Sequence, residues 1–310
     1  MTTLLVTHKA FLEHDTGYGH PEQPDRMRAI ADALAAPAFG ALKREEAPEA
    51  DLAAIERLHP KAYIEMVRAA IPSQHHQRLD PDTVVSRGSW EAALRAVGGA
   101  LRAVDAVVGG EAKNAFCASR PPGHHAEPAR AMGFCLFNNV AVAALHARAR
   151  HGAERVAVVD FDVHHGNGTQ AAFWTQKDLF YASTHQMPLF PGTGELGETG
   201  VGNIFNVPLK AGDDGDEFRD AFLSRILPGL HNFGPDLIIV SAGFDAHRMD
   251  PLAQLRLVEP DFAWVTEKLM DQAEKHCGGK LVSCLEGGYD LDALGRSVAT
   301  HVGTLMGGAS

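Results

Sequence analysis

The segment VAVVDFDVHHGNGT (156–169) begins as a hydrophobic strand and ends in residues suited to chemistry. Its first four residues are apolar, and Asp160, Asp162 and His164 follow them at a spacing of two. If the strand stays extended, this spacing places the three side chains on one side of it. Three ionisable groups that converge in this way need a cation or strong ion pairing to be tolerated. The segment therefore predicts a functional site at the end of a buried strand.

Short apolar runs of this kind recur along the chain, at 3–7, 114–119, 155–161, 179–184, 236–242 and 280–286. Amphipathic helical patterns lie between several of them, at 89–110, 138–152, 215–230 and 260–276. Near-continuous apolar strands that alternate with such helices are typical of a mainly parallel sheet covered on both faces. The most loop-like segment, 71–82, is short for a domain boundary, so we expect a single α/β domain over residues 1–310.

The composition of the chain, with 45% hydrophobic and 22% charged residues, is that of an ordinary soluble globular protein. Its 28 basic and 39 acidic residues give a net charge of −11, which argues against nucleic acid as a partner. We expect a cytoplasmic protein with no membrane partner, because neither a signal peptide nor an apolar run long enough to cross a bilayer is evident. The scattered cysteines favour buried, reduced thiols: Cys117, Cys135, Cys277 and Cys284.

Residues suited to chemistry follow three further apolar runs. NAFCAS is followed by RPPGHHA, LIIV by SAGFDAH, and LVSCL by EGGYD. In sheets of parallel strands, ligands bind beyond the carboxyl ends of the strands. The sequence therefore predicts an active site at this edge of the sheet.

The pair Asp162-x-His164 supplies an oxygen and a nitrogen ligand suited to zinc. A third ligand is expected from elsewhere in the fold, and Asp245, at the end of another predicted strand, is the best candidate. Three protein ligands leave zinc an open position for water and a substrate carbonyl, which is the mark of a catalytic site.

His124 and His125 stand side by side after Pro-Pro-Gly, a stiff turn that fixes where they point. Asp160 and Asn167 lie in the predicted metal segment and are available to bond ring N–H groups of the two histidines. Adjacent histidines are common in loops, and we assign no role to the second pair at 75–76.

Five motifs, in this order, resemble those of the zinc-dependent histone deacetylase superfamily: RPPGHHA, GFCLFNN, DFDVHHGNG, SAGFDAH and LEGGYD. The match begins at GHPEQPDR (19–26) and covers most of the chain. The resemblance implies the arginase/deacetylase fold, a three-layer α/β domain with a central, mainly parallel sheet of eight strands. Asn167 stands where many class I members have Asp, so in this respect the chain resembles class II-type bacterial histone deacetylase-like amidohydrolases, which are related to acetylpolyamine amidohydrolases. Because Asn cannot balance an imidazolium, we expect His125 to stay neutral.

The resemblance also implies roles for individual residues. The implied zinc ligands are Asp162, His164 and Asp245. The implied catalytic residues are the tandem His124 and His125, oriented by Asp160 and Asn167, and Tyr289, which faces the zinc. The implied lining of the acyl-lysine tunnel is Gly133, Phe134 and Phe190, with Leu252 as the gatekeeper at its mouth, where members that prefer acetylpolyamines have Glu. An implied structural potassium site comprises Asp160, Asp162, His164 and Ser183.

These features predict a zinc-dependent amidohydrolase that removes acetyl or other acyl groups from the side-chain amine of lysine, or from a related small acylamide, by metal-activated water. An acetylpolyamine deacetylase is the alternative within the same chemistry. A catalytically weak acyl-lysine binding protein is the alternative from another class, but such a protein is expected to lose a ligand or Tyr289. A two-manganese ureohydrolase needs the pattern Asp-x-His-x-Asp. Gly166 stands at the last position, so the second metal would lack a ligand and we set this enzyme class aside.

Overall fold

The computed structural model of the chain describes residues 2–308. Its centre is an eight-stranded sheet in which every neighbouring pair is parallel. The strands lie in the order β2 (Lys43–Glu46), β1 (Thr3–Thr7), β5 (Asn114–Cys117), β10 (Leu281–Leu285), β9 (Leu237–Ala242), β6 (Val156–Asp160), β7 (Leu179–Gln186) and β8 (Ile204–Leu209). A small antiparallel hairpin, β3 (Gln77–Arg78) with β4 (Val84–Val85), stands apart from this sheet. The predicted parallel α/β fold is confirmed.

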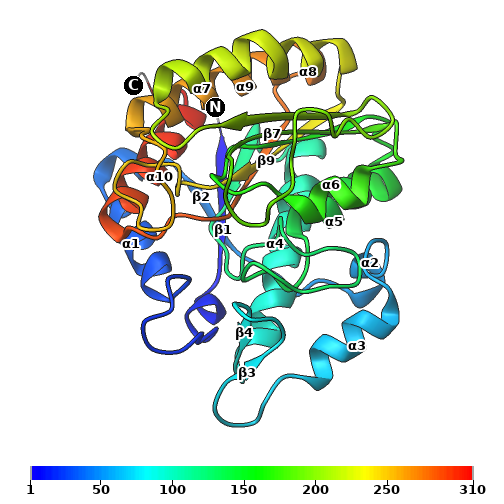
Figure 1. Cartoon of the computed structure of the whole chain (residues 1–310), viewed down its shortest axis with the longest axis vertical. Helices are drawn as coiled ribbons and strands as arrows, with labels where there is room; N and C mark the ends of the chain where they lie inside the picture. The colour runs from blue at the N-terminus through cyan, green and yellow to red at the C-terminus, as the bar shows by residue number, and fades with distance from the viewer. Residues whose placement is uncertain (1, 309–310) are drawn as a thin grey trace.

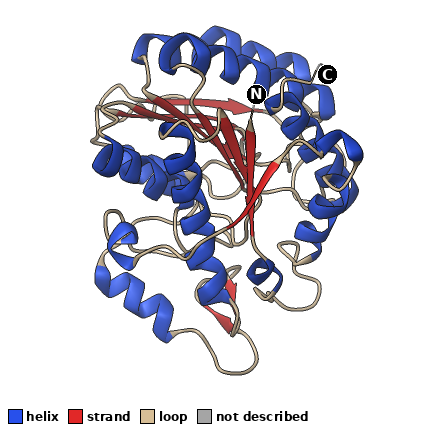
Figure 2. Ribbon diagram, turned by 180° about the vertical axis from the view of Figure 1, so that it is seen from behind, coloured by secondary structure: helices blue, strands red, loops and turns tan. Residues whose placement is uncertain are grey.

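Helices cover both faces of the sheet (Figures 1 and 2). One layer consists of α4 (Ser89–Val108), α5 (Asn139–His151) and α6 (Asn167–Phe173). The other consists of α1 (Asp25–Ala33), α7 (Gly215–Ala221), α8 (Leu227–Phe233), α9 (Glu259–Cys277) and α10 (Leu291–Leu305). Two short helices, α2 (Leu52–Ile55) and α3 (Lys61–Ala69), precede the hairpin, and two 3-10 helices lie at Lys9–Leu12 and Pro37–Phe39. The three layers are those that the fold prediction named.

The structure differs from the sequence-based expectations in several places, of which the following concern the sheet and one helix. The helix expected at 215–230 is divided by a π-helical turn at Phe222–Ile226. Strands β2 and β8 were not predicted, because both are sheet edges. The β2 sequence, KREE, has no apolar pattern, whereas the β8 sequence, IFNVPL, is mostly apolar but contains Pro208, which argues against a strand. Charged residues and proline are both tolerated at sheet edges. Finally, β6 ends at Asp160, so the chain does not stay extended as far as His164.

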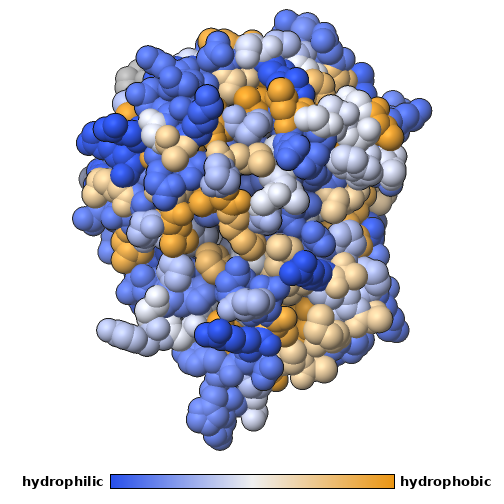
Figure 3. Space-filling model, in the orientation of Figure 1, coloured by the Kyte–Doolittle hydropathy of each residue, from blue (hydrophilic) through white to orange (hydrophobic). Residues whose placement is uncertain are grey.

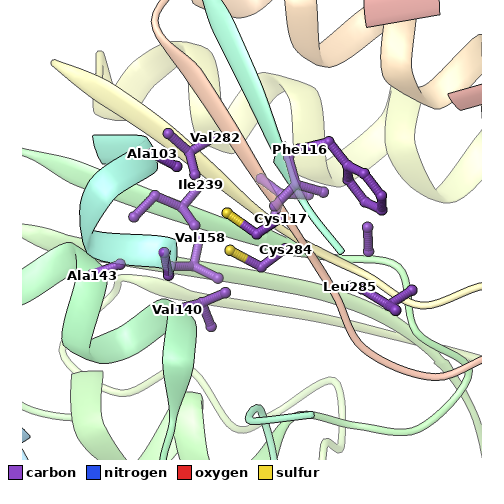
Figure 4. Packing of buried hydrophobic residues seen from close by; sticks show 14 of the residues in the cluster. Ala103, Phe116, Cys117, Val140, Ala143, Val158, Ile239, Val282, Cys284 and Leu285 are labelled. Carbon is purple, nitrogen blue, oxygen red and sulfur yellow. The ribbon is translucent and has the colours of Figure 1, made fainter. Parts of the chain in front are cut away.

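The inner strands are buried on both sides and form the core with the helices. Figure 4 shows this packing around Val158, Ile239 and Val282 of three neighbouring strands. Cys117 and Cys284 lie opposite each other on β5 and β10. All four cysteines of the chain are buried and free, as the sequence predicts.

The surface is mixed in character. On the face shown in Figure 3, hydrophobic residues form scattered patches among larger hydrophilic areas. Across the part of the chain that the structure describes, no helix combines the length and the apolar character needed to cross a membrane.

Candidate active site

The predicted site residues gather at one edge of the sheet because they follow four strands that are neighbours in it. The tandem histidines come after β5, Asp162 and His164 after β6, Asp245 after β9, and Tyr289 after β10. The order β5-β10-β9-β6 is continuous in the sheet, and all four strands run in the same direction. Their carboxyl ends therefore bring together side chains that lie far apart in the sequence.

Asp162, His164 and Asp245 form a compact, buried cluster. Nδ1 of His164 lies 3.1 Å from Oδ1 of Asp162 and 3.1 Å from Oδ2 of Asp245. Each residue offers one ligand atom, and these atoms all lie within 4.8 Å of one another. Although β6 has ended, a tight turn in which Asp162 Oδ1 accepts a hydrogen bond from the His164 amide keeps the two side chains together.

Backbone amides hold the two carboxylates in place. Gly287 N donates to Asp162 Oδ2 at 2.7 Å, and Val163 N donates to Asp245 Oδ1 at 2.9 Å. A Cβ atom on Gly287 would overlap the carboxylate of Asp245, and one on Gly243 would overlap that of Asp162. The two glycines therefore allow the backbone to approach these carboxylates closely.

The cluster favours positive charge. Burial lowers the pKa of His164, but hydrogen bonds to Asp162 and Asp245 outweigh it and raise the pKa to about 10. Burial and the charge of Asp162 raise the pKa of Asp245. Two buried carboxylates beside one imidazole are a donor set of the kind that divalent zinc takes, so the residues present fit the predicted metal.

The tandem histidines have different hydrogen-bond partners. Nδ1 of His124 lies 2.9 Å from Oδ2 of Asp160, whereas Nδ1 of His125 lies 2.9 Å from Oδ1 of Asn167. The two ring centroids are 4.0 Å apart. Both rings are therefore oriented through Nδ1, in the pairing that the resemblance implies, and the second nitrogen of each remains for chemistry.

The electrostatics of the two histidines diverge. Burial opposes charge on His124, but the carboxylates of Asp160, Asp162 and Glu286 outweigh it and raise its pKa well above the ordinary value. Burial and the charge of His124 lower the pKa of His125 well below the ordinary value. The shifts favour a neutral His125 beside a charged His124, as expected, but through burial and charge repulsion, because the hydrogen bond to Asn167 acts in the opposite direction.

Three supporting residues were not identified from the sequence. Oε2 of Glu286 accepts hydrogen bonds from the amides of Gly123 (2.7 Å) and His124 (3.1 Å). Glu127 accepts a hydrogen bond of 2.8 Å from the side-chain amide of Asn167. The hydroxyl of Tyr181 donates to Asp160 at 3.1 Å. Of the three, only Glu286 left a signal, since it stands in the LEGGYD motif directly after a buried strand.

Tyr289 is buried, with its ring against that of Phe134 at 5.8 Å between centroids. Its amide donates a hydrogen bond of 2.7 Å to Asp250, and the preceding Gly288 has a φ of +123°. Burial raises the pKa of the phenol well above its ordinary value, so the hydroxyl keeps its proton and can act as a donor.

A cavity of about 250 Å³ leads to these residues. Its lining includes His125, His164 and Tyr289 and all four predicted tunnel residues, Gly133, Phe134, Phe190 and Leu252. Asp82 and Leu189 also line it and were not predicted. The ring of Phe190 lies 5.0 Å from that of His125. A Cβ on Gly133, whose φ is +56°, would overlap the His125 ring, so this wall requires glycine.

The structure also places Ser183 and the second histidine pair. Ser183 lies on β7 directly opposite Asp160 and bonds Nδ1 of His185 at 2.9 Å. The potassium site that the resemblance implies stays a prediction. The second histidine pair lies outside the cavity lining, and His76 pairs with Asp15 at 3.0 Å on the surface.

The fold is that of a deacetylase domain, as a solved structure shows. The model of the histone deacetylase domain matches residues 20–305. The chain therefore belongs to the histone deacetylase family, and the resemblance seen in its motifs is confirmed. Membership supports a deacetylase or amidohydrolase activity in general.

Individual comparisons agree with this assignment. The chain is 44% identical to the histone deacetylase-like amidohydrolase of Pseudomonas aeruginosa, over 87% of this chain and 73% of that protein. It is 38% identical to a probable deacetylase of Archaeoglobus fulgidus, over 94% of this chain and 82% of that protein. The crystal structure of the HDA15 HD domain superposes with a TM-score of 0.94 at 37% identity, covering 99% of this chain and 89% of that one.

Proposed function

We propose that the chain is a zinc-dependent amidohydrolase that removes acyl groups from the side-chain amine of lysine or from a related small acylamide. The observation that carries this proposal is the position of the Asp162–His164–Asp245 cluster beside a narrow cavity that His125 and Tyr289 also line. A metal-ligand set, a base and a hydrogen-bond donor thus share one space.

Asp162, His164 and Asp245 would hold the zinc. When bound, zinc supplies a Lewis acid that polarises an acyl carbonyl and lowers the pKa of a water molecule. Further chemistry comes from the side chains around it.

His125 is the general base in this proposal. Its Nδ1 is engaged by Asn167, and its lowered pKa keeps Nε2 free to take the proton of the attacking water. His124, whose pKa is raised by the surrounding carboxylates, is protonated in this proposal and stabilises the negative charge of the site. A protonated histidine of the pair then gives a proton to the leaving amine. Tyr289 donates a hydrogen bond to the developing oxyanion, because its phenol remains protonated.

The cavity lining supports an acyl-lysine or another substrate with an aliphatic stem. Phe134, Phe190 and Leu252 present apolar surface that an extended methylene chain can cover. Leu252 offers no charge to attract the second amine of a polyamine. An acetylpolyamine substrate is therefore the second candidate within the same chemistry.

A binding protein without turnover is the alternative that the residues favour least. All three ligands, both histidines and Tyr289 are present at one site. Zinc content measured together with hydrolysis of a fluorogenic acetyl-lysine peptide tests the proposal. Stoichiometric zinc with turnover supports it, and zinc without turnover on any acyl-lysine or acylamide tested would favour the binding protein.

A further inference from the structure

A second group of metal-ligand side chains lies on the helices, away from the cavity. Asp105 comes from α4, and His146 and His151 come from α5, which packs against α4. Nε2 of His146 lies 2.7 Å and Nε2 of His151 lies 2.6 Å from the same oxygen, Oδ1 of Asp105. The two imidazole ring centroids are 5.8 Å apart, and the ring planes meet at 72°.

The positions of the three residues follow from the ends of the two helices. His151 is the last residue of α5, where Gly152 adopts a φ of +66° and ends the helix, and Asp105 lies in the last turn of α4. Both helices lead into strands of the parallel sheet, β5 and β6, so their carboxyl ends meet at the edge opposite the catalytic cavity. The partial negative charge of helix carboxyl ends favours a cation there.

We propose that Asp105, His146 and His151 form a second site for a divalent transition metal, of which zinc is the representative ion. One ligand atom of each residue lies within 4.8 Å of the other two, as in the catalytic cluster. Two imidazoles and a carboxylate are ligands that zinc accepts, and three protein ligands leave a position for water. The exposed fractions of the side chains, 11% for His146, 22% for His151 and 41% for Asp105, leave an open side through which an ion can enter.

Binding requires a local change of hydrogen bonding. Each Nε2 now donates to Asp105, and a metal would take the place of these two hydrogen atoms, with the ring proton carried on Nδ1. Nη1 of Arg57 lies 3.5 Å from Nδ1 of His146, where an N–H on that nitrogen would face another donor. Arg57 is exposed and free to turn away, so its side chain weakens the site without blocking it.

A metal bound at this site would have a structural role and not a catalytic one. A metal held by residues of α4 and α5 would join the ends of two helices that otherwise meet through apolar packing and hydrogen bonds. Bound ion stabilises the folded chain in proportion to its affinity, since the three ligands converge only in the native state.

Equilibrium dialysis of the full chain against zinc alone, followed by metal quantification, tests the proposal. We expect two zinc ions per chain for the wild type, one for His151→Ala, one for Asp105→Asn and one for Asp245→Ala. The double variant Asp245→Ala/His151→Ala should bind none above background. Arg57→Gln should bind the second ion more tightly than the wild type.

His276→Ala is the matched control, because it removes one histidine of a surface pair, His231 and His276, whose ring nitrogens bond each other at 2.9 Å. It should still bind two ions. Retention of the wild-type number of ions, whether one or two, by both His151→Ala and Asp105→Asn would overturn the second site. Asp245→Ala reports on the catalytic ion alone. If the catalytic ligand set is wrong, Asp245→Ala keeps the wild-type number of ions, whereas His151→Ala still loses one.

Thermal unfolding gives an independent readout. Added zinc should raise the Tm of Asp245→Ala, in which the helix site is intact, and should leave that of the double variant unchanged. Equal shifts in the two proteins would contradict the proposal even if both are folded.

Discussion

The side-chain oxygen of Asn167 lies 2.9 Å from Nδ1 of His125, in the position that the carboxylate of Asp160 takes beside His124. The neutral Asn167 stabilises an imidazolium less than the carboxylate of Asp160 does, because it adds a hydrogen bond but no charge. Two adjacent histidines with the same geometry thus have pKa values shifted in opposite directions.

The first prediction follows from this difference. His125→Ala should lower kcat by about 10²–10⁴, the range typical for loss of a general base, and His124→Ala should lower it less. Steady-state kinetics of the two variants at several pH values provide the comparison. Equal losses, or a larger loss for His124→Ala, would reverse the division of roles.

Asp245→Ala should remove catalytic zinc and activity together while the chain stays folded. The substitution takes away one of three ligands and relieves the repulsion that Asp245 shares with the buried Asp162. Metal analysis, turnover and circular dichroism provide the measurements, with Asp105→Asn as the control that should keep the activity. Full turnover by the Asp245 variant would show that the ligand set is wrong.

Tyr289→Phe should lower kcat by about 10²–10³ and leave the zinc content unchanged, because the phenol is a donor to the oxyanion and not a ligand. Tyr63→Phe is the matched control. Its hydroxyl is also buried and donates a hydrogen bond of 2.6 Å to Leu136 O, so this variant should lose some stability and keep kcat. If Tyr289→Phe stays within a few-fold of the wild type, Tyr289 is only a wall of the cavity.

Gly133→Ala should lower kcat by roughly 10², since the new methyl group would displace the His125 ring and small misplacements of a catalytic group have effects of that size. Zinc binding should persist. Gly110→Ala imposes similar backbone strain, at a φ of +78°, with no atom near the new Cβ, and serves as the control. Similar activity of the two variants would rule out contact with His125 as the cause.

Substrate preference depends on Leu252 at the cavity wall. We expect acetyl-lysine peptides or neutral acylamides to be hydrolysed with higher kcat/KM than acetylputrescine or acetylspermidine. Leu252→Glu should move this ratio toward the polyamines, because the new carboxylate attracts their second amine. A wild-type preference for acetylpolyamines would refute the gatekeeper argument and leave the amidohydrolase chemistry intact.

Much of the site could be predicted because several of its residues lie close together in the sequence, directly after an apolar run. Asp160, Asp162 and His164 follow one apolar run, and a parallel sheet brings the ends of neighbouring strands to one edge whatever their separation along the chain. Strand order was not predictable in the same way, since β10 and β9 lie between β5 and β6 in space but follow both in sequence. The edge strand β2, with its charged KREE sequence, carried no apolar signal at all.

Residues that act through long-range contacts were also missed. Glu127 and Asp82 reach the site from loops whose paths depend on the complete fold. His146 and His151 are spaced by five on α5, which is not a spacing that places two side chains on one helix face. Their meeting at Asp105 is set by the packing of α5 against α4, and no local pattern reveals it.

The position of β10 and β9 between β5 and β6 in the sheet determines when the site can assemble during synthesis of the chain. As the chain leaves the ribosome, the tandem histidines and Asp162 emerge long before Asp245 and Tyr289. The two strands that precede the early residues cannot pair with each other, because their places in the sheet are separated by strands not yet made. The cluster of Asp162, His164 and Asp245 needs only β6 and β9, which pair directly, whereas the tandem histidines join it when β10 has filled the place between β9 and β5. Under the proposed function, the complete site is therefore assembled only after synthesis of the last strand.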